Sequence, residues 1–156
     1  MFTKILVPYD GSKYAEKALN SAVFLAKLIK GSEIIIINVI DEIITPPMVI
    51  PTKVRNYKTG EDTTLPTYIR DLQKDMQYKM MDRLEEIKRK YQNSVRIKIF
   101  VTVGPAEVKI ADYANRKNVD LIVMGSKGLK GISRLIVGSV SRTVSEKVKC
   151  TVMIVR

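Results

Sequence analysis

One apolar run constrains the fold more than any other feature of this 156-residue chain. Residues Ile34 to Ile37 are four consecutive isoleucines, and Asn38 and Val39 follow them. A β-branched segment that is apolar on both faces predicts a central strand with helices covering both sides of its sheet. Parallel strands of this kind need crossover connections, usually helices. The segment therefore predicts an α/β fold in which strands and helices alternate.

The rest of the chain has this alternation. Strand patterns lie at residues 4–8, 34–39, 95–103, 119–124 and 151–155. Apolar residues spaced three and four apart predict helices that begin near Ser12, Tyr68, Pro105 and Val140. Ser12 has the side chain of a helix cap. We expect residues 1–156 to form a single three-layer α/β/α domain of the flavodoxin or Rossmann-like type, with a five-stranded parallel sheet in the order 3-2-1-4-5.

Residues 41–67 interrupt the pattern between the second strand and the second helix. This segment contains Pro46, Pro47, Pro51 and Pro66, which are four of the six prolines. Connections of this length are uncommon in compact domains and are typical of lids or mobile segments. We expect a variable, mobile insertion here.

A glycine-rich run follows the fourth strand and precedes the last helix. Gly125 and Gly128 are followed, after nine residues, by Gly138 and Ser139. Glycines let backbone N–H groups approach an anion, and the start of a helix directs unpaired N–H groups toward it. Ligands of parallel sheets bind beyond the strand ends where the strand order reverses, here between strands one and four. Because Asp10 follows strand one, it falls at the same crevice as the glycine run, and a nucleotide site is predicted there.

Several other kinds of site are excluded. The chain has neither a Walker A sequence nor a Gly-x-Gly-x-x-Gly run after the first strand. It has no histidine and one cysteine, which removes the usual general base and the usual zinc ligands. A metal would therefore be a hard cation held by oxygens and phosphates.

Composition limits the partners and the compartment. The formal net charge is +11, which favours anionic partners, but acidic residues are mixed with the basic ones over residues 74–90. Nucleic acid is therefore the weaker alternative. No apolar run is long enough to span a membrane, and the N-terminal apolar segment is too short for a secretory signal. The lone Cys150 agrees with a reducing compartment, so we expect a soluble cytoplasmic protein.

Several segments of the chain resemble the universal stress protein family. The matching parts are residues 5–12, 103–106, 120–125 and the Gly-x2-Gly-x9-Gly-Ser run, and the resemblance is weakest over 41–67. The glycine spacing is similar to the signature of the ATP-binding branch of the family. The resemblance thus implies ATP, accompanied by Mg²⁺ or Mn²⁺ held mainly through the phosphates. One departure is Thr151 after Cys150, because the family commonly has proline before the last strand.

The resemblance also implies an ATP-binding set, which comprises Pro8, Asp10, Val39, Met124, Gly125, Gly128, Gly138, Ser139 and Val140. Val39 matches the family position that touches adenine. Three of these residues have plain structural alternatives: a turn residue for Asp10, core packing for Met124 and a helix cap for Ser139. Three basic residues either neutralise phosphate charge or are solvated loop charges, namely Lys127, Lys130 and Arg134.

The expected function is a nucleotide-dependent switch or sensor with slow or no ATP hydrolysis, because no general base is evident beyond Asp10. No catalytic residue is assigned. The alternatives are a slow ATPase that phosphorylates itself, and a basic partner- or nucleic-acid-binding module without a nucleotide. ATP, AMP and a cyclic nucleotide all fit the pattern. The apolar last strand forms a sheet edge that favours a homodimer through Thr151, Val152, Met153, Ile154 and Val155.

Overall fold

The computed structural model describes residues 1–42, 53–56, 58–129 and 137–156. Within these residues, five parallel strands form the main sheet in the spatial order β5-β2-β1-β6-β7. The strands are β1 (Lys4–Pro8), β2 (Glu33–Ile40), β5 (Arg96–Val103), β6 (Leu121–Gly125) and β7 (Thr151–Val155). Counted along the main sheet, this order is three, two, one, four, five, so the predicted α/β topology is confirmed.

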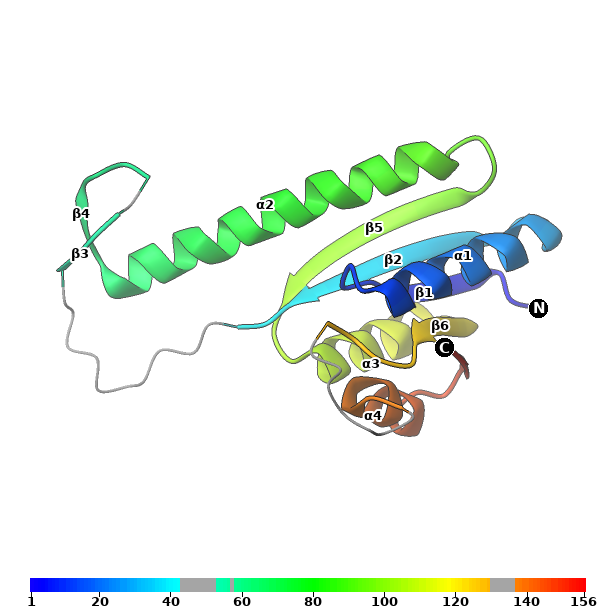
Figure 1. Ribbon diagram of the computed structural model, residues 1–156. Helices are drawn as coiled ribbons and strands as arrows, with labels where there is room; N and C mark the ends of the chain where they lie inside the picture. The colour runs from blue at the N-terminus through cyan, green and yellow to red at the C-terminus, as the bar shows by residue number, and fades with distance from the viewer. Residues whose placement is uncertain (43–52, 57, 130–136) are drawn as a thin grey trace.

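Helices cover both faces of the sheet (Figure 1). They are α1 (Lys13–Leu28), α2 (Leu65–Tyr91), α3 (Ala106–Lys117) and α4 (Ser139–Lys147). Ser12 caps α1 as predicted, because its Oγ accepts a hydrogen bond from the Ala15 N–H at 3.1 Å. None of the helices in the described ranges combines the length and apolar character needed to cross a membrane.

Strand β2 explains why the sheet has a core on each side. Ile34 and Ile36 pack with residues of α1 and α2 on one face, whereas Ile35 and Ile37 pack with residues of α3 and α4 on the other. All four side chains are buried. Each contributes about 1.5–3 kcal/mol of hydrophobic stabilisation when fully buried. The run of isoleucines therefore fixes β2 inside the sheet with both faces covered.

The segment between β2 and α2 differs from the expectation. Strands β3 (Lys53–Arg55) and β4 (Asp62–Thr64) form an antiparallel hairpin that the sequence pattern did not predict. Helix α2 begins at Leu65 instead of near Tyr68, because proline is well accommodated in the first turn of a helix. Residues 43–52 and 57 lie outside the described residues, so the predicted mobility of the segment stays a prediction.

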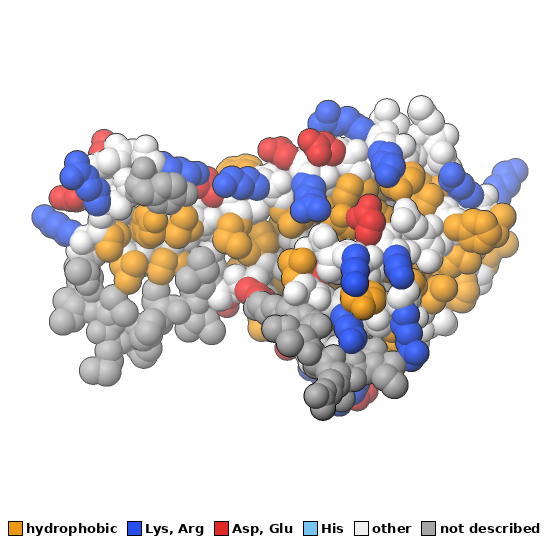
Figure 2. Space-filling model, viewed as in Figure 1, with side chains coloured by type: hydrophobic (Ala, Val, Ile, Leu, Met, Phe, Trp, Pro, Cys, Tyr) orange, Lys and Arg blue, Asp and Glu red, His pale blue; other side chains and the backbone are white. Residues whose placement is uncertain are grey.

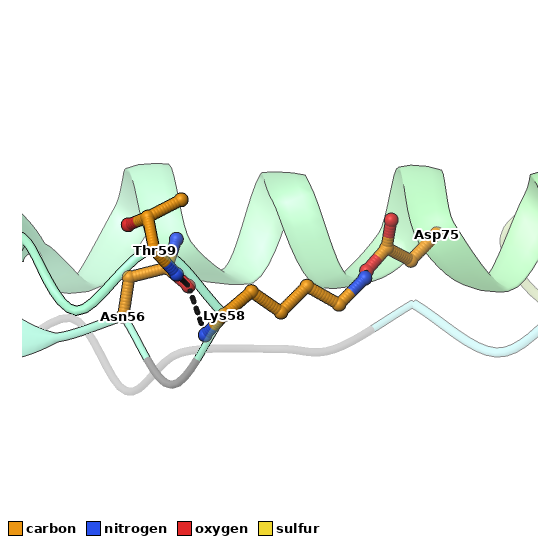
Figure 3. Close-up of polar contacts among 4 residues, drawn as sticks. All are labelled: Asn56, Lys58, Thr59 and Asp75. Atoms are coloured by element: carbon orange, nitrogen blue, oxygen red, sulfur yellow. Dashed lines mark hydrogen bonds and ion pairs between the residues drawn. The ribbon is translucent and has the colours of Figure 1, made fainter.

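Polar contacts hold the hairpin against α2 (Figure 3). The Asn56 Oδ1 accepts a hydrogen bond from the Lys58 N–H at 2.9 Å, and the Lys58 ammonium forms an ion pair with Asp75 of α2. The N-terminal half of α2 extends past the sheet (Figure 1), and Figure 2 shows hydrophobic side chains along it. Met76 and Tyr78 are accordingly exposed.

Asp120 ties the start of β1 to the start of β6. Its Oδ2 accepts hydrogen bonds from the Thr3 N–H at 2.9 Å, the Thr3 hydroxyl at 2.8 Å and the Lys4 N–H at 2.8 Å. The Lys4 N–H, followed by the Thr3 hydroxyl, lowers the pKa of the Asp120 carboxyl below its usual value. The charged form of Asp120 therefore stabilises the folded chain.

Replacing Asp120 with asparagine should lower the free energy of unfolding at pH 7 by about 1–2 kcal/mol, because N–H groups bond a charged acceptor more strongly than a neutral one. The contribution is fully present above the unfolded pKa of about 3.9 and is lost as the pH falls through the lower folded pKa. Urea unfolding at neutral and acid pH measures this, with the exposed carboxylate variant Asp112→Asn as the control. A loss of equal size at both pH values would contradict the prediction.

Candidate functional site

The candidate site lies at the carboxyl ends of β1 and β6, which are neighbouring parallel strands. One loop follows Pro8 and leads into α1, and the other follows Gly125 and leads toward α4 (Figure 1). Two residues of the second loop that we expected to carry phosphate-neutralising charge, Lys130 and Arg134, lie outside the described residues. The described parts of both loops meet at one edge of the sheet.

Asp10 joins the two loops. Its Oδ1 accepts a hydrogen bond from the Ser12 N–H at 2.9 Å, within its own loop. Its Oδ2 accepts a hydrogen bond from the Leu129 N–H at 3.0 Å, in the loop after β6. Asp10 therefore stabilises the turn of its own loop and also links the two loops. Asp10 and the loop that contains the glycine run are therefore in contact, whereas a ligand site between them stays a prediction.

Gly125 and Gly128 are held so closely that neither has room for a side chain. A Cβ on Gly125 would lie 2.7 Å from the backbone carbonyl carbon of Tyr14, at the start of α1. A Cβ on Gly128 would lie 2.7 Å from the Asp10 Oδ2. The first glycine is thus required by the packing of β6 against α1, whereas a Cβ at the second would displace the carboxylate that bridges the loops.

The start of α4 lies against the glycine loop. The Gly138 N–H donates to the Ser126 carbonyl at 2.7 Å, and Gly138 occupies the cap position of α4. The interpretation of Ser139 as a plain helix cap is therefore wrong: Ser139 is the first helical residue and is exposed, and the cap residue is Gly138. The first N–H groups of a helix have no partner within it, and Ser139 and Val140 carry two of them.

Two buried serines hold this arrangement and were missed by the sequence analysis. The Ser126 N–H donates to the Val155 carbonyl at 2.7 Å, which ties the glycine loop to the end of β7. The Ser141 hydroxyl donates to the Gly125 carbonyl at 2.8 Å, which ties α4 to the end of β6. Serine is common in loops and at helix starts, so neither position carries a signal of its own in the sequence.

The other predicted residues lie around the same edge. Pro8 and Val39 are half-buried near the carboxyl ends of β1 and β2, and Val39 packs against the core on the α3 and α4 side. Met124 is buried in that core, as the core-packing alternative predicted. Lys127 is half-buried in the glycine loop.

The donor set at the site offers little to a bare metal ion. Within the described part of the chain, no three His, Cys, Asp or Glu side chains cluster in a way that could hold a metal. Asp10 is the one carboxylate among residues 8–12, 125–129 and 137–140. A hard cation would therefore need most of its oxygen ligands from a bound molecule such as a polyphosphate.

Comparison with known sequences gives relatives over the full length of the chain. The sequence model of one protein family, Usp (universal stress protein family), matches residues 1–156. Universal stress protein YxiE of Bacillus subtilis (strain 168) is 32% identical over 157 residues, which cover 100% of both chains. Universal stress protein MJ0577 of Methanocaldococcus jannaschii is 29% identical over 157 residues, covering 100% of this chain and 96% of its own.

Solved structures share the fold. The MJ0577 structure has a TM-score of 0.79 at 28% identity and covers 99% of this chain and 96% of its own. Universal stress protein UspA of Lactobacillus plantarum has a TM-score of 0.82 at 24% identity, with 99% and 98% covered.

Two more distant structures contain nucleotides. A universal stress protein in complex with cAMP has a TM-score of 0.66 at 19% identity, with 99% of this chain and 97% of its own covered. An Arabidopsis thaliana family protein with AMP bound has a TM-score of 0.64 at 18% identity, with 98% and 90% covered. At such identities these two structures speak for the fold alone. The match of the family model to every residue, together with YxiE at 32% identity, shows that the chain belongs to the universal stress protein family.

Proposed function

We propose that residues 1–156 act as one ATP-binding domain that works as a nucleotide-dependent switch or sensor with slow or no ATP hydrolysis. One observation carries the proposal. The Asp10 carboxylate, the side-chain-free Gly128 and the start of α4, where Gly138 is the cap residue, lie together at the carboxyl ends of the strands where the sheet order reverses. Parallel sheets of this kind bind their ligands at such an edge.

The charges at this edge suit a polyanionic tail. The N-terminal N–H groups of α4 and the positive end of its dipole favour phosphate. We assign the phosphates to the backbone of Gly138, Ser139 and Val140, with the Ser139 hydroxyl donating a further hydrogen bond. The backbone N–H groups of Gly125 and Gly128 would then face the ribose and the phosphates.

We place the adenine end of the nucleotide at the carboxyl end of β2. Val39 lies at the carboxyl end of this strand, and we assign it to the adenine ring through its backbone. Asp10 would meet the nucleotide directly or, through water, a Mg²⁺ or Mn²⁺ ion on the phosphates. Because the chain belongs to a family in which other members have AMP or cAMP bound, we assign an adenine nucleotide to this site. Which adenine nucleotide the chain prefers is answered by identifying the molecule that copurifies with it.

The charge on the surface does not favour nucleic acid as the main ligand. Figure 2 shows Lys and Arg side chains scattered over the visible face, with Asp and Glu side chains among them. Binding to nucleic acid through the phosphate backbone favours a stripe or patch of one sign. The start of α4 is the better anion site.

We also propose a homodimer through β7. This strand pairs with β6 and forms one edge of the main sheet, and Met153 on it is 40% exposed. An exposed apolar edge strand offers unpaired backbone groups to a second copy. No catalytic residue is required from the partner in this arrangement.

Changing Gly128 to alanine should weaken ATP binding in the presence of Mg²⁺ by about tenfold, or about 1.4 kcal/mol. The added Cβ would displace the Asp10 Oδ2 and disturb the crevice, while the exposed loop position leaves the fold intact. Isothermal titration calorimetry measures the affinity, and circular dichroism checks the fold. Lys147→Ala, an exposed change at the far end of α4, is the control. Equal affinities for Gly128→Ala and the parent chain would refute the site.

Hydrolysis should be slow. Asp10 already accepts two backbone hydrogen bonds, so neither carboxylate oxygen is placed as a dedicated base, and the chain has no histidine. Release of phosphate from γ-labelled ATP should stay well below the ~1 s⁻¹ at which ordinary enzymes begin. Rapid multiple turnover, or transfer of the label to a serine or threonine of the chain, would favour the enzyme alternative instead.

Changing Met153 to lysine should convert the dimer to a monomer at micromolar concentration, because a charge on an edge strand opposes strand pairing. Sedimentation equilibrium of the parent chain and the variant measures this. Phe24→Lys, which changes an exposed apolar residue on α1, should leave the dimer intact. A parent chain that sediments as a monomer would rule out this interface.

A further inference from the structure

Arg83 of α2 reaches the loop between β1 and α1. Its guanidinium atoms lie 3.2–3.5 Å from the point where a Cβ of Gly11 would be. Gly11 has a φ of +83°, a backbone conformation that residues with side chains rarely adopt. Because Gly11 has no side chain, the loop can turn at this residue, and the Arg83 guanidinium has room to lie against it.

The same guanidinium lies beside the residue that precedes Asp10. Tyr9 is buried, and its hydroxyl donates to the Glu16 Oε2 at 2.6 Å. Burial, followed by the hydrogen bond to Glu16, raises the pKa of Tyr9 to about 12, and the nearby Arg83 acts in the opposite direction. Arg83 is thus close to the neighbours of Asp10 on both sides in the sequence, Tyr9 and Gly11.

Strand β2 fixes the main chain at this point. The Asn38 Nδ2 donates to the Tyr9 carbonyl at 2.7 Å, and the Tyr9 N–H donates to the Ile37 carbonyl at 2.8 Å. Asn38 is 4% exposed, and its buried Oδ1 has no hydrogen-bond partner among the residues that the structure describes. Burying the Asn38 amide with one oxygen unsatisfied costs free energy. The hydrogen bond from its Nδ2 to the Tyr9 carbonyl offsets part of this cost, so this bond is structurally important. The main chain of Tyr9 is held by β2, while its side chain is held by α1 and lies beside Arg83.

We infer that Arg83 is a positioning residue of the nucleotide site, which holds the Asp10 carboxylate in place through the loop on either side of it. Asp10 must face the Ser12 N–H and the Leu129 N–H at the same time. This requires one conformation of the loop from Tyr9 to Ser12. The guanidinium over Gly11 and beside the Tyr9 hydroxyl restricts the loop to that conformation. The inference rests on the proposed function, because it deepens the role of the same site.

The test compares two replacements of Arg83. Arg83→Met keeps most of the stem and removes the charge, whereas Arg83→Lys keeps a positive charge. The Kd for ATP with Mg²⁺ should rise about tenfold in Arg83→Met and less than about threefold in Arg83→Lys. Arg89→Met, an exposed change on the last turns of the same helix, should leave the Kd unchanged. Equal binding by Arg83→Met and the parent chain would overturn the inference.

A double-mutant cycle separates positioning from a general structural effect. If Arg83 acts through Asp10, the variant carrying Asp10→Asn and Arg83→Met should bind no more weakly than Asp10→Asn alone. Losses that multiply in the double variant would show that Arg83 acts independently of Asp10, and would also overturn the inference.

Amide hydrogen exchange without nucleotide keeps the inference separate from the proposed function. Arg83→Met should speed exchange at the Ser12 and Leu129 N–H groups, which donate to Asp10, and leave the Lys109 N–H in α3 unchanged. If the parent chain bound no nucleotide, the proposed function would fail, and this exchange measurement alone would decide whether Arg83 positions the loop. Unchanged exchange at Ser12 and Leu129 would refute it.

Discussion

The hydrogen bond between the Asp10 carboxylate and the Leu129 N–H joins two loops that are 119 residues apart in the chain. The rest of the site depends on this bond. It explains why Gly128 has no room for a side chain, and it sets the distance between the loop after β1 and the loop that leads to α4. A buried sheet supplies the rigid base, because β1 and β6 are adjacent strands with apolar cores on both faces.

Most of the fold follows from local patterns. The isoleucines of β2 indicate a covered central strand, and the alternation of strands with helices leaves few topologies with right-handed crossovers. The hairpin of β3 and β4 was not predicted, because three-residue strands carry too little periodicity and their place depends on contacts such as Lys58 with Asp75. The prolines of this segment marked an interruption, yet Pro66 belongs to the first turn of α2.

The sequence predicted the parts of the candidate site in which residues act through the backbone. It did not predict the parts in which distant side chains act. The spacing from Gly125 to Gly138 locates the loop, and close contacts leave little room for a Cβ at Gly125 and Gly128. Ser139 was assigned to the ligand set with a helix cap as the alternative, and this alternative is wrong because Gly138 occupies the cap position. Arg83 could not be found from the sequence at all, since one arginine on an exposed helix face resembles every other until the helix is packed.

Gly125 and Gly128 are subject to different physical demands. A side chain at Gly125 would collide with the backbone of α1 whether or not a ligand is present, whereas one at Gly128 would collide with a carboxylate at the mouth of the crevice. In a related chain without the proposed ligand, the demand at Gly128 would be relaxed, whereas the demand at Gly125 would remain. Among such chains Gly128 would then vary before Gly125, so a glycine at the end of β6 would not by itself indicate a nucleotide site.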